Sequence, residues 1–159
     1  MMTRLALLAT LLALAAPAFA HGAGRGEAKA TFAGKAVTIE YGRPSLEGRD
    51  MLAQAEVGKP WRMGADAATT LKTDADLSFA GGSVARGEYI LTATKVAEGK
   101  WHLNVLTKEK AKVADVPLEV AKLPAGVETL TIDLTGAEGN GTFTLSWGDI
   151  ALTATFTGK

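Results

Sequence analysis

The chain has 159 residues, with 17 lysines and arginines against 17 aspartates and glutamates, and it contains no cysteine. This near-neutral balance argues against a nucleic-acid-binding protein and against binding to an anionic membrane surface. The absence of cysteine excludes disulfides and cysteine-built zinc sites, so a hydrophobic core must stabilise what is about one domain's length of chain.

The N-terminal segment, residues 1–20, has the pattern of a secretory signal peptide. Arg4 supplies a positive charge, residues 5–16 form an apolar run rich in Leu and Ala, and Ala18-Phe19-Ala20 is typical of a cleavage site. A membrane anchor is the alternative, but the apolar run is shorter than the ~20 residues that a spanning helix needs. We therefore predict cleavage after Ala20 and a periplasmic or secreted protein with no membrane span after cleavage.

Residues 21–27 are rich in glycine, and we expect them to be flexible and to precede a single folded domain over residues 28–159. Alternating apolar residues lie on both sides of the turn signal Ala33-Gly34-Lys35: Ala28, Ala30 and Phe32, then Val37, Ile39 and Tyr41. This period of two predicts a β-hairpin with one apolar face.

The alternation is interrupted by residues 42–49 (GRPSLEGR), which we call the first motif loop. Gly48 permits a tight turn there. Asp50 is then a suitable N-cap for a short helix over residues 51–57, which Gly58 would end. We therefore expect one loop followed by one short helix.

Residues 58–70 (GKPWRMGADAATT) form the second motif loop, and from Thr69 onward strand alternation dominates. Turn signals divide the alternation at Gly81-Gly82, residues 123–126, Asn140-Gly141 and Gly148-Asp149, and Pro117 indicates an edge strand. We predict an all-β protein, an antiparallel β-sandwich or sandwich-like barrel of about ten strands with one short helix.

Two motifs carry a resemblance to a known family. Residues 41–49 resemble a Y-x-R-P-S-x-x-G-R motif, and residues 61–70 resemble W-R-x-G-A-N-x-A-T-T. Residues 87–91 and 101–104 resemble two further strands of the same bacterial family, which is called domain of unknown function 2911. The resemblance covers residues 28–156 and implies an exported β-rich domain with no established activity. This chain has Asp66 where the family usually has Asn.

The motif loops also hold the candidate site. If both meet at one end of the sandwich, they form a cationic pocket with an indole and hydroxyl groups, built from Arg43, Ser45, Arg49, Lys59, Trp61, Arg62, Asp66, Thr69 and Thr70. Guanidinium groups match carboxylates and phosphates, so an anion or a sugar acid is the expected ligand. The alternative is structural: Arg43 or Arg62 pairs with Asp66 or Glu47 and fixes the loops to the sheet. An exposed Trp61 would favour binding, and a buried one would be an anchor.

Other chemistries are weaker. Ser45, His102 and Asp66 form a catalytic arrangement only on paper, because no nucleophile-elbow motif accompanies them. His21 becomes the N-terminal residue after cleavage and, with His102, has nitrogens that copper favours, but its neighbours are flexible glycines. The acidic residues lack the spacing of a calcium loop. We predict no catalytic residue, no metal and no cofactor.

The sequence therefore favours an exported, non-catalytic protein that uses residues 42–49 and 58–70 to bind a small anionic or carbohydrate ligand or an envelope partner. The alternative is a hydrolase or carbohydrate-active enzyme that works through Asp66 and Glu47. A third reading is a purely structural envelope component. Two carboxylates across an open cleft would favour the enzyme.

Overall fold

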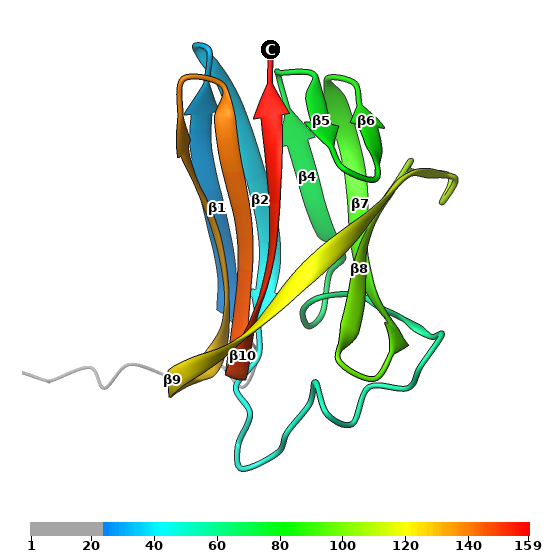
Figure 1. Cartoon of the computed structure of the whole chain (residues 1–159), viewed down its shortest axis with the longest axis vertical. Helices are drawn as coiled ribbons and strands as arrows, with labels where there is room; N and C mark the ends of the chain where they lie inside the picture. The colour runs from blue at the N-terminus through cyan, green and yellow to red at the C-terminus, as the bar shows by residue number, and fades with distance from the viewer. Residues whose placement is uncertain (1–23) are drawn as a thin grey trace, which may run out of the picture.

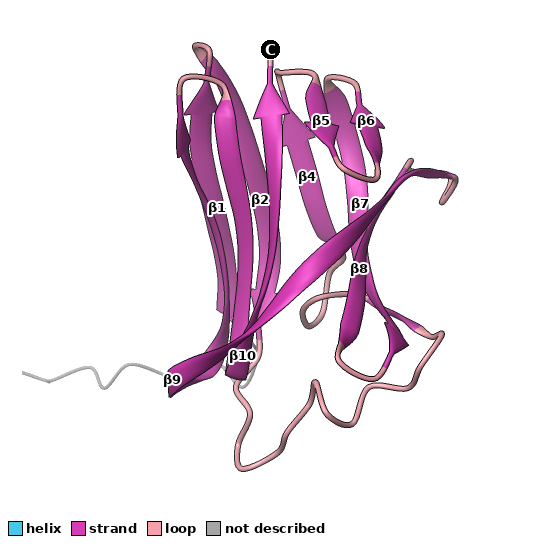
Figure 2. Cartoon of the chain, in the orientation of Figure 1, coloured by secondary structure: helices cyan, strands magenta, loops and turns pink. Residues whose placement is uncertain are grey.

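The computed structural model describes residues 24–159, and within them every regular element is a β-strand (Figure 1, Figure 2). The strands are β1 (Gly24–Phe32), β2 (Lys35–Arg43), β3 (Pro60–Trp61), β4 (Thr69–Thr73), β5 (Leu77–Phe79), β6 (Gly82–Val84), β7 (Gly87–Ala97), β8 (Lys100–Leu106), β9 (Lys112–Ala137) and β10 (Asn140–Gly158). The predicted all-β class is thus confirmed. No helix in this part of the chain is long and apolar enough to cross a membrane.

The strands form one antiparallel ladder that folds into two layers, in the order β1-β2-β4-β7-β8-β9-β10-β5-β6, with β3 paired to β7. The long strand β9 connects the layers and runs diagonally across Figure 1. Its first part pairs with β8 and its second part pairs with β10. We call β1, β2, β4, β7, β8 and the first part of β9 the first layer, and the rest of β9 with β10, β5 and β6 the second layer.

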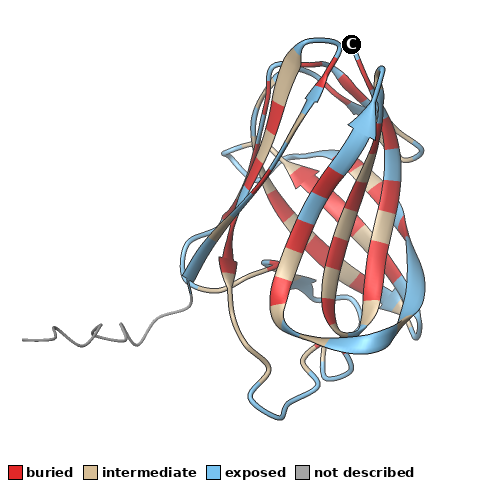
Figure 3. Ribbon diagram, turned by 90° about the vertical axis from the view of Figure 1, so that its left-hand side faces the viewer, coloured by how far each residue is buried: buried red, intermediate tan, exposed pale blue. Residues whose placement is uncertain are grey.

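The core lies between the layers, and buried residues alternate with half-buried or exposed ones along the strands (Figure 3). Val37 of β2 and Leu103 of β8 come from the first layer, while Ile132 of β9 and Leu152 of β10 come from the second. All four are at most 2% exposed. The opposite face of each strand carries the polar residues, so each layer has a dry side and a wet side.

The short helix expected over residues 51–57 is absent, which corrects that prediction. Asp50 does act as a cap, because its Oδ1 accepts a hydrogen bond from the Ala53 backbone N–H at 3.0 Å. A single helical bond follows, from the Gln54 N–H to the Asp50 carbonyl at 3.1 Å. The segment stops after this turn, since a short isolated helix does not recover the free-energy cost of its nucleus.

The turns were predicted with mixed success. Ala33 and Gly34, with φ angles of 49° and 78°, form the expected tight turn between β1 and β2. The turn expected at Asn140-Gly141 lies instead at Glu138-Gly139, with φ angles of 52° and 83°, and Asn140 is already paired with Ala137.

Two predicted turns are absent, at residues 123–126 and at Gly148-Asp149. Both stretches belong to strands and lie side by side in the β9–β10 ladder, where Gly148, with a φ angle of 68°, pairs with Val127 between two register shifts. The shifts bend the hairpin without ending either strand. Pro117 lies on the first part of β9, which pairs with β8 only, as expected for an edge.

The folded part also begins earlier than the boundary expected at residue 28. Residues 24–27 belong to β1, where Gly24 pairs with Arg43 and Glu27 with Glu40. The predicted signal peptide over residues 1–20 and His21, which was considered and set aside as a copper ligand, lie outside the described residues.

Candidate functional site

The two motif loops meet through their backbones. A Cβ atom added to Gly42 would lie 2.0 Å from the carbonyl oxygen of Ala65, and one added to Gly64 would lie 2.9 Å from the carbonyl oxygen of Gly42. Only glycine allows such an approach. The glycines of both motifs therefore allow the loops to come into contact, at the end of the sandwich where the long connection between β2 and β4 runs (lower end of Figure 1).

Arg43 and Ser45 attach the first motif loop to β9. The Arg43 Nε donates to the Leu130 carbonyl at 3.2 Å, and its Nη2 donates to the Thr131 hydroxyl at 3.3 Å. The Ser45 hydroxyl lies 3.2 Å from that of Thr129. These groups are engaged within the fold, and the guanidinium binds backbone and hydroxyl oxygens rather than the carboxylate expected from the sequence.

Glu128 extends this attachment. Its carbonyl accepts from the Leu46 N–H at 3.0 Å and from the Trp147 indole Nε1 at 3.1 Å. Its carboxylate accepts from the Glu47 N–H at 2.9 Å. The backbone of an irregular loop needs such partners, and the first motif loop finds them along β9.

The cations at the edges of the loops lie at the surface. The Arg62 Nη1 donates to the Asp66 carbonyl at 2.8 Å, and the Arg49 Nε donates to the Leu46 carbonyl at 3.2 Å. Lys59 pairs with Glu56 at 2.6 Å, with both side chains mostly exposed. Neither Asp66 nor Glu47 forms an ion pair among the described residues, so the expected pairing of Arg62 with a carboxylate is replaced by a bond to a carbonyl.

Asp66 has a φ angle of 63°, in the left-handed region. Asn and Asp enter this region more readily than most other residues. The Asn-to-Asp departure from the family motif therefore has a backbone explanation. Thr69, which is fully buried, supports the same loop by donating to the Met63 carbonyl at 3.0 Å.

Trp61 is a half-buried anchor rather than an open platform. Its ring stacks on Trp147 of β10, with centroids 5.8 Å apart and an interplanar angle of 10°. It also meets Trp101 of β8 edge-on at 6.2 Å. Because Trp101 belongs to the first layer and Trp147 to the second, the indole of Trp61 ties the second motif loop to both layers.

The catalytic arrangement considered for Ser45, His102 and Asp66 finds no support in their contacts. Ser45 is bonded to Thr129, while the Nδ1 of His102 lies 2.5 Å from the Oδ1 of Asp115. No group of three or more His, Cys, Asp or Glu residues within 24–159 is placed to hold a metal ion.

A hollow of about 280 Å³ lies on the wet face of the first layer, over β2, β4 and β7. Its lining is Thr38, Glu40, Thr70, Leu71, Lys72, Glu88, Tyr89, Ile90 and Lys108. Among the predicted site residues only Thr70 belongs to it. Alternation assigns Thr38, Glu40 and Ile90 to a wet face, but the hollow requires the order β2-β4-β7, which the sequence does not reveal.

Charge on this hollow is balanced. Lys108 and Glu88 form an ion pair at 2.7 Å. The hydrogen bond and charge of Lys108, with a further contribution from Lys72, hold the pKa of Glu88 below its usual value, and Glu88 in turn raises the pKa of Lys108. Glu40 and Lys72 make no ion pair among the described residues, so one carboxylate and one ammonium remain available.

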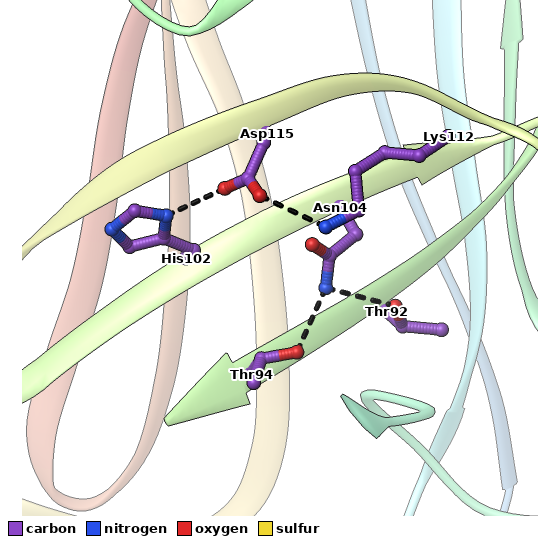
Figure 4. A network of polar contacts seen from close by, with 6 residues as sticks. All are labelled: Thr92, Thr94, His102, Asn104, Lys112 and Asp115. Atoms are coloured by element: carbon purple, nitrogen blue, oxygen red, sulfur yellow. Dashed lines mark hydrogen bonds and ion pairs between the residues drawn. The ribbon is translucent and has the colours of Figure 1, made fainter. Parts of the chain in front are cut away.

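A second polar cluster lies on the same face, on β7, β8 and β9 (Figure 4). The Oδ1 of Asp115 is bonded to His102, and its Oδ2 accepts a hydrogen bond from the Lys112 ammonium at 2.9 Å. The bond from Lys112 and then the bond with His102 lower the pKa of Asp115. The Asn104 amide donates to the hydroxyls of Thr92 at 3.2 Å and Thr94 at 3.0 Å. We call these six residues the polar network.

A two-layered antiparallel β-protein with motif loops closing one end and a polar sheet face is thus the class that the fold and the site define. The chain belongs to the family described as protein of unknown function (DUF2911), whose sequence model matches residues 24–156. This confirms the resemblance seen in the motifs. Comparison with curated proteins and with solved structures gives no match.

Proposed function

We propose that the protein is exported to the periplasm or secreted, and that it is a non-catalytic protein that binds a small carbohydrate ligand. Export rests on the signal-like pattern of residues 1–20. The ligand binds on the wet face of the first layer, while the motif loops serve as the scaffold that closes the sandwich.

The hollow over β2, β4 and β7 carries this proposal. It offers hydroxyls from Thr38 and Thr70, a free carboxylate from Glu40, a free ammonium from Lys72 and an apolar side chain from Ile90. Binding sites combine apolar surface with a few polar groups that fix orientation. Because the charges here balance, a neutral polyhydroxylated molecule, which both donates and accepts, suits the hollow better than an anion does.

The cationic pocket expected at the motif loops is less favourable for an anion. The guanidinium of Arg43 is bonded to Leu130 and Thr131, and those of Arg49 and Arg62 are bonded to carbonyls of their own loops. An anionic ligand would have to compete with the bonds of Arg43, and it would reach the remaining donors of Arg49 and Arg62 only on the exposed surface, where solvent weakens an ion pair. An envelope partner at these loops would meet the same groups.

No specific observation favours the alternative of a hydrolase using Asp66 and Glu47. Asp66 is exposed, at a turn position with a left-handed backbone conformation. The backbone N–H of Glu47 is bonded to the Glu128 carboxylate. Neither residue lines the hollow on the sheet face.

The test is calorimetric titration of the mature protein with neutral sugars, sugar acids and inorganic phosphate. We expect a neutral sugar to bind, and Thr70→Val and Glu40→Gln each to weaken it by about fivefold, the loss of about one hydrogen bond. Thr144→Val, on the wet face of the second layer, is the matched control and should bind normally. Binding of sugar acids or phosphate alone, or equal loss in the control, would contradict the proposal.

A further inference from the structure

We infer that the binding surface continues from the hollow onto the polar network, and that the ligand is a neutral oligosaccharide chain rather than a single sugar. This inference rests on the proposed function and specifies its ligand. It uses Thr92, Thr94 and Asn104, which the sequence assigned to no site, together with His102, which the sequence offered only for chemistries set aside above.

The two regions are continuous along β7. Ile90 lines the hollow, and Thr92 and Thr94 follow on the same face of the strand. Each step of two residues advances about 7 Å along a strand, so polar groups extend for about 14 Å beyond Ile90. In the ladder, Thr92 lies opposite Asn104 and Thr94 lies opposite His102, so the surface is two strands wide.

Asn104 fixes the direction of the hydrogen bonds at this surface. It is only 3% exposed although it lies on the wet side of β8, and buried amides require hydrogen-bond partners. Its Nδ2 gives one proton to Thr92 and the other to Thr94. Since each hydroxyl oxygen is already an acceptor, each hydroxyl can donate its own proton outward to a ligand.

His102 supplies the complementary acceptor. Its Nδ1 is held by Asp115, which Lys112 holds from the other side. In the neutral imidazole, donation from Nδ1 to the carboxylate leaves Nε2 as an acceptor. In Figure 4 this second nitrogen points away from Asp115.

The network thus presents two donors and one acceptor on rigid strands. The charges of Asp115 and Lys112 satisfy one another, so the surface attracts no ion of either sign strongly. Sugar hydroxyls both donate and accept, and several of them in a row would match an array of this length. A single monosaccharide would fill the hollow and leave the network unused.

The experiment compares glucose and xylose with cellohexaose, maltohexaose and xylohexaose by calorimetry on the mature protein. We expect one hexasaccharide to bind at least about tenfold more tightly than its monosaccharide, the effect of two further hydrogen bonds. Thr94→Val and His102→Ala should each remove about half of this gain in binding free energy without changing monosaccharide affinity. Thr144→Val is the control, and a thermal melt of each variant checks folding.

The outcomes separate the two proposals. If sugars bind with no dependence on chain length, or if Thr94→Val and His102→Ala keep the full gain while folded, the inference is wrong and the proposed function stands. If one of these variants unfolds, the other still gives the result, because His102 is about one-third exposed and its removal leaves Asn104 bonded. If none of these saccharides binds, the proposed function and the inference both fail.

Discussion

Arg43 and Arg49 lie in the same motif loop, yet their contacts differ. Arg43 reaches β9 with two hydrogen bonds, whereas the exposed Arg49 bonds only to the carbonyl of the neighbouring Leu46. We expect Arg43→Ala to lower the free energy of unfolding by about 2 kcal/mol, since it leaves partly buried acceptors unpaired, and Arg49→Ala by less than about 0.5 kcal/mol. Urea denaturation measures both. Equal losses would show that Arg43 does not fasten the loop.

Asp115 provides a test by pH. Hydrogen bonds from Lys112 and then His102 lower its pKa, so the folded protein holds the carboxylate ionised at a pH where the unfolded chain takes up a proton. Its stabilisation is therefore complete above the ordinary value near 3.8 and is lost as the pH falls through the lower folded value. Because the Asp115 side chain is 43% exposed, we expect its ionised carboxylate to contribute less than about 1 kcal/mol to the free energy of unfolding.

Denaturation of the wild type and of Asp115→Asn between neutral and acid pH measures the stabilisation that the ionised Asp115 carboxylate provides. The stability difference between them should be constant near neutrality and should shrink as the solution is acidified below about pH 4. Lys112→Ala, which removes the largest cause of the shift, should reduce the pH-dependent part. A difference that grows on acidification would reverse the sign we assign.

At the scale of elements, the contact between the motif loops depends on Gly42. A Cβ at this position would overlap the Ala65 carbonyl, so we expect Gly42→Ala to cost about 2 kcal/mol or more in unfolding free energy. Gly126→Ala is the matched control, because its Cβ would meet nothing closer than 3.8 Å and should change stability by less than about 0.5 kcal/mol. If both variants melt like the wild type, the loops are not held at this point.

The elements that the sequence predicted well are those set by local alternation. The β1–β2 hairpin and its turn at Ala33-Gly34 follow from the apolar period alone. The turn between β9 and β10 was misplaced at Asn140-Gly141. Gly139 and Gly141 both permit such a turn, and the pairing of β10 with β9 decides between them. The prediction of a helix over residues 51–57 was wrong, because a good cap does not offset the nucleation cost of so short a helix.

The site was harder to predict, because it is built from distant partners. Arg43 bonds to a carbonyl 87 positions later in the chain, and no sequence pattern identifies a backbone acceptor. The motif loops do meet, which was the condition of the site hypothesis, but the close approach is at their glycines rather than at their cations. The hollow depends on β4 lying between β2 and β7, an order in which sequence neighbours are separated. The polar network lies on the consecutive strands β7, β8 and β9, but its hydrogen-bond partners follow from the register of those strands.

For the whole molecule, we propose that support and binding are carried by different parts of the fold. The motif loops and Trp61 close one end and link both layers, so the family motifs describe how the sandwich is held together. The wet face of the first layer then offers free groups on a rigid surface, which is how sites with fixed geometry are supported. The central claim is that ligand binds to this face and not to the motif loops.

Backbone chemical-shift mapping, during titration with the saccharide that binds most tightly, tests this claim most directly. We predict that the largest changes occur at the amides of Ile90, Thr92, Thr94, His102 and Asn104, with little change over residues 42–49 and 58–66. Changes confined to those loop residues, with the sheet face unaffected, would contradict the account and return the site to the motif loops.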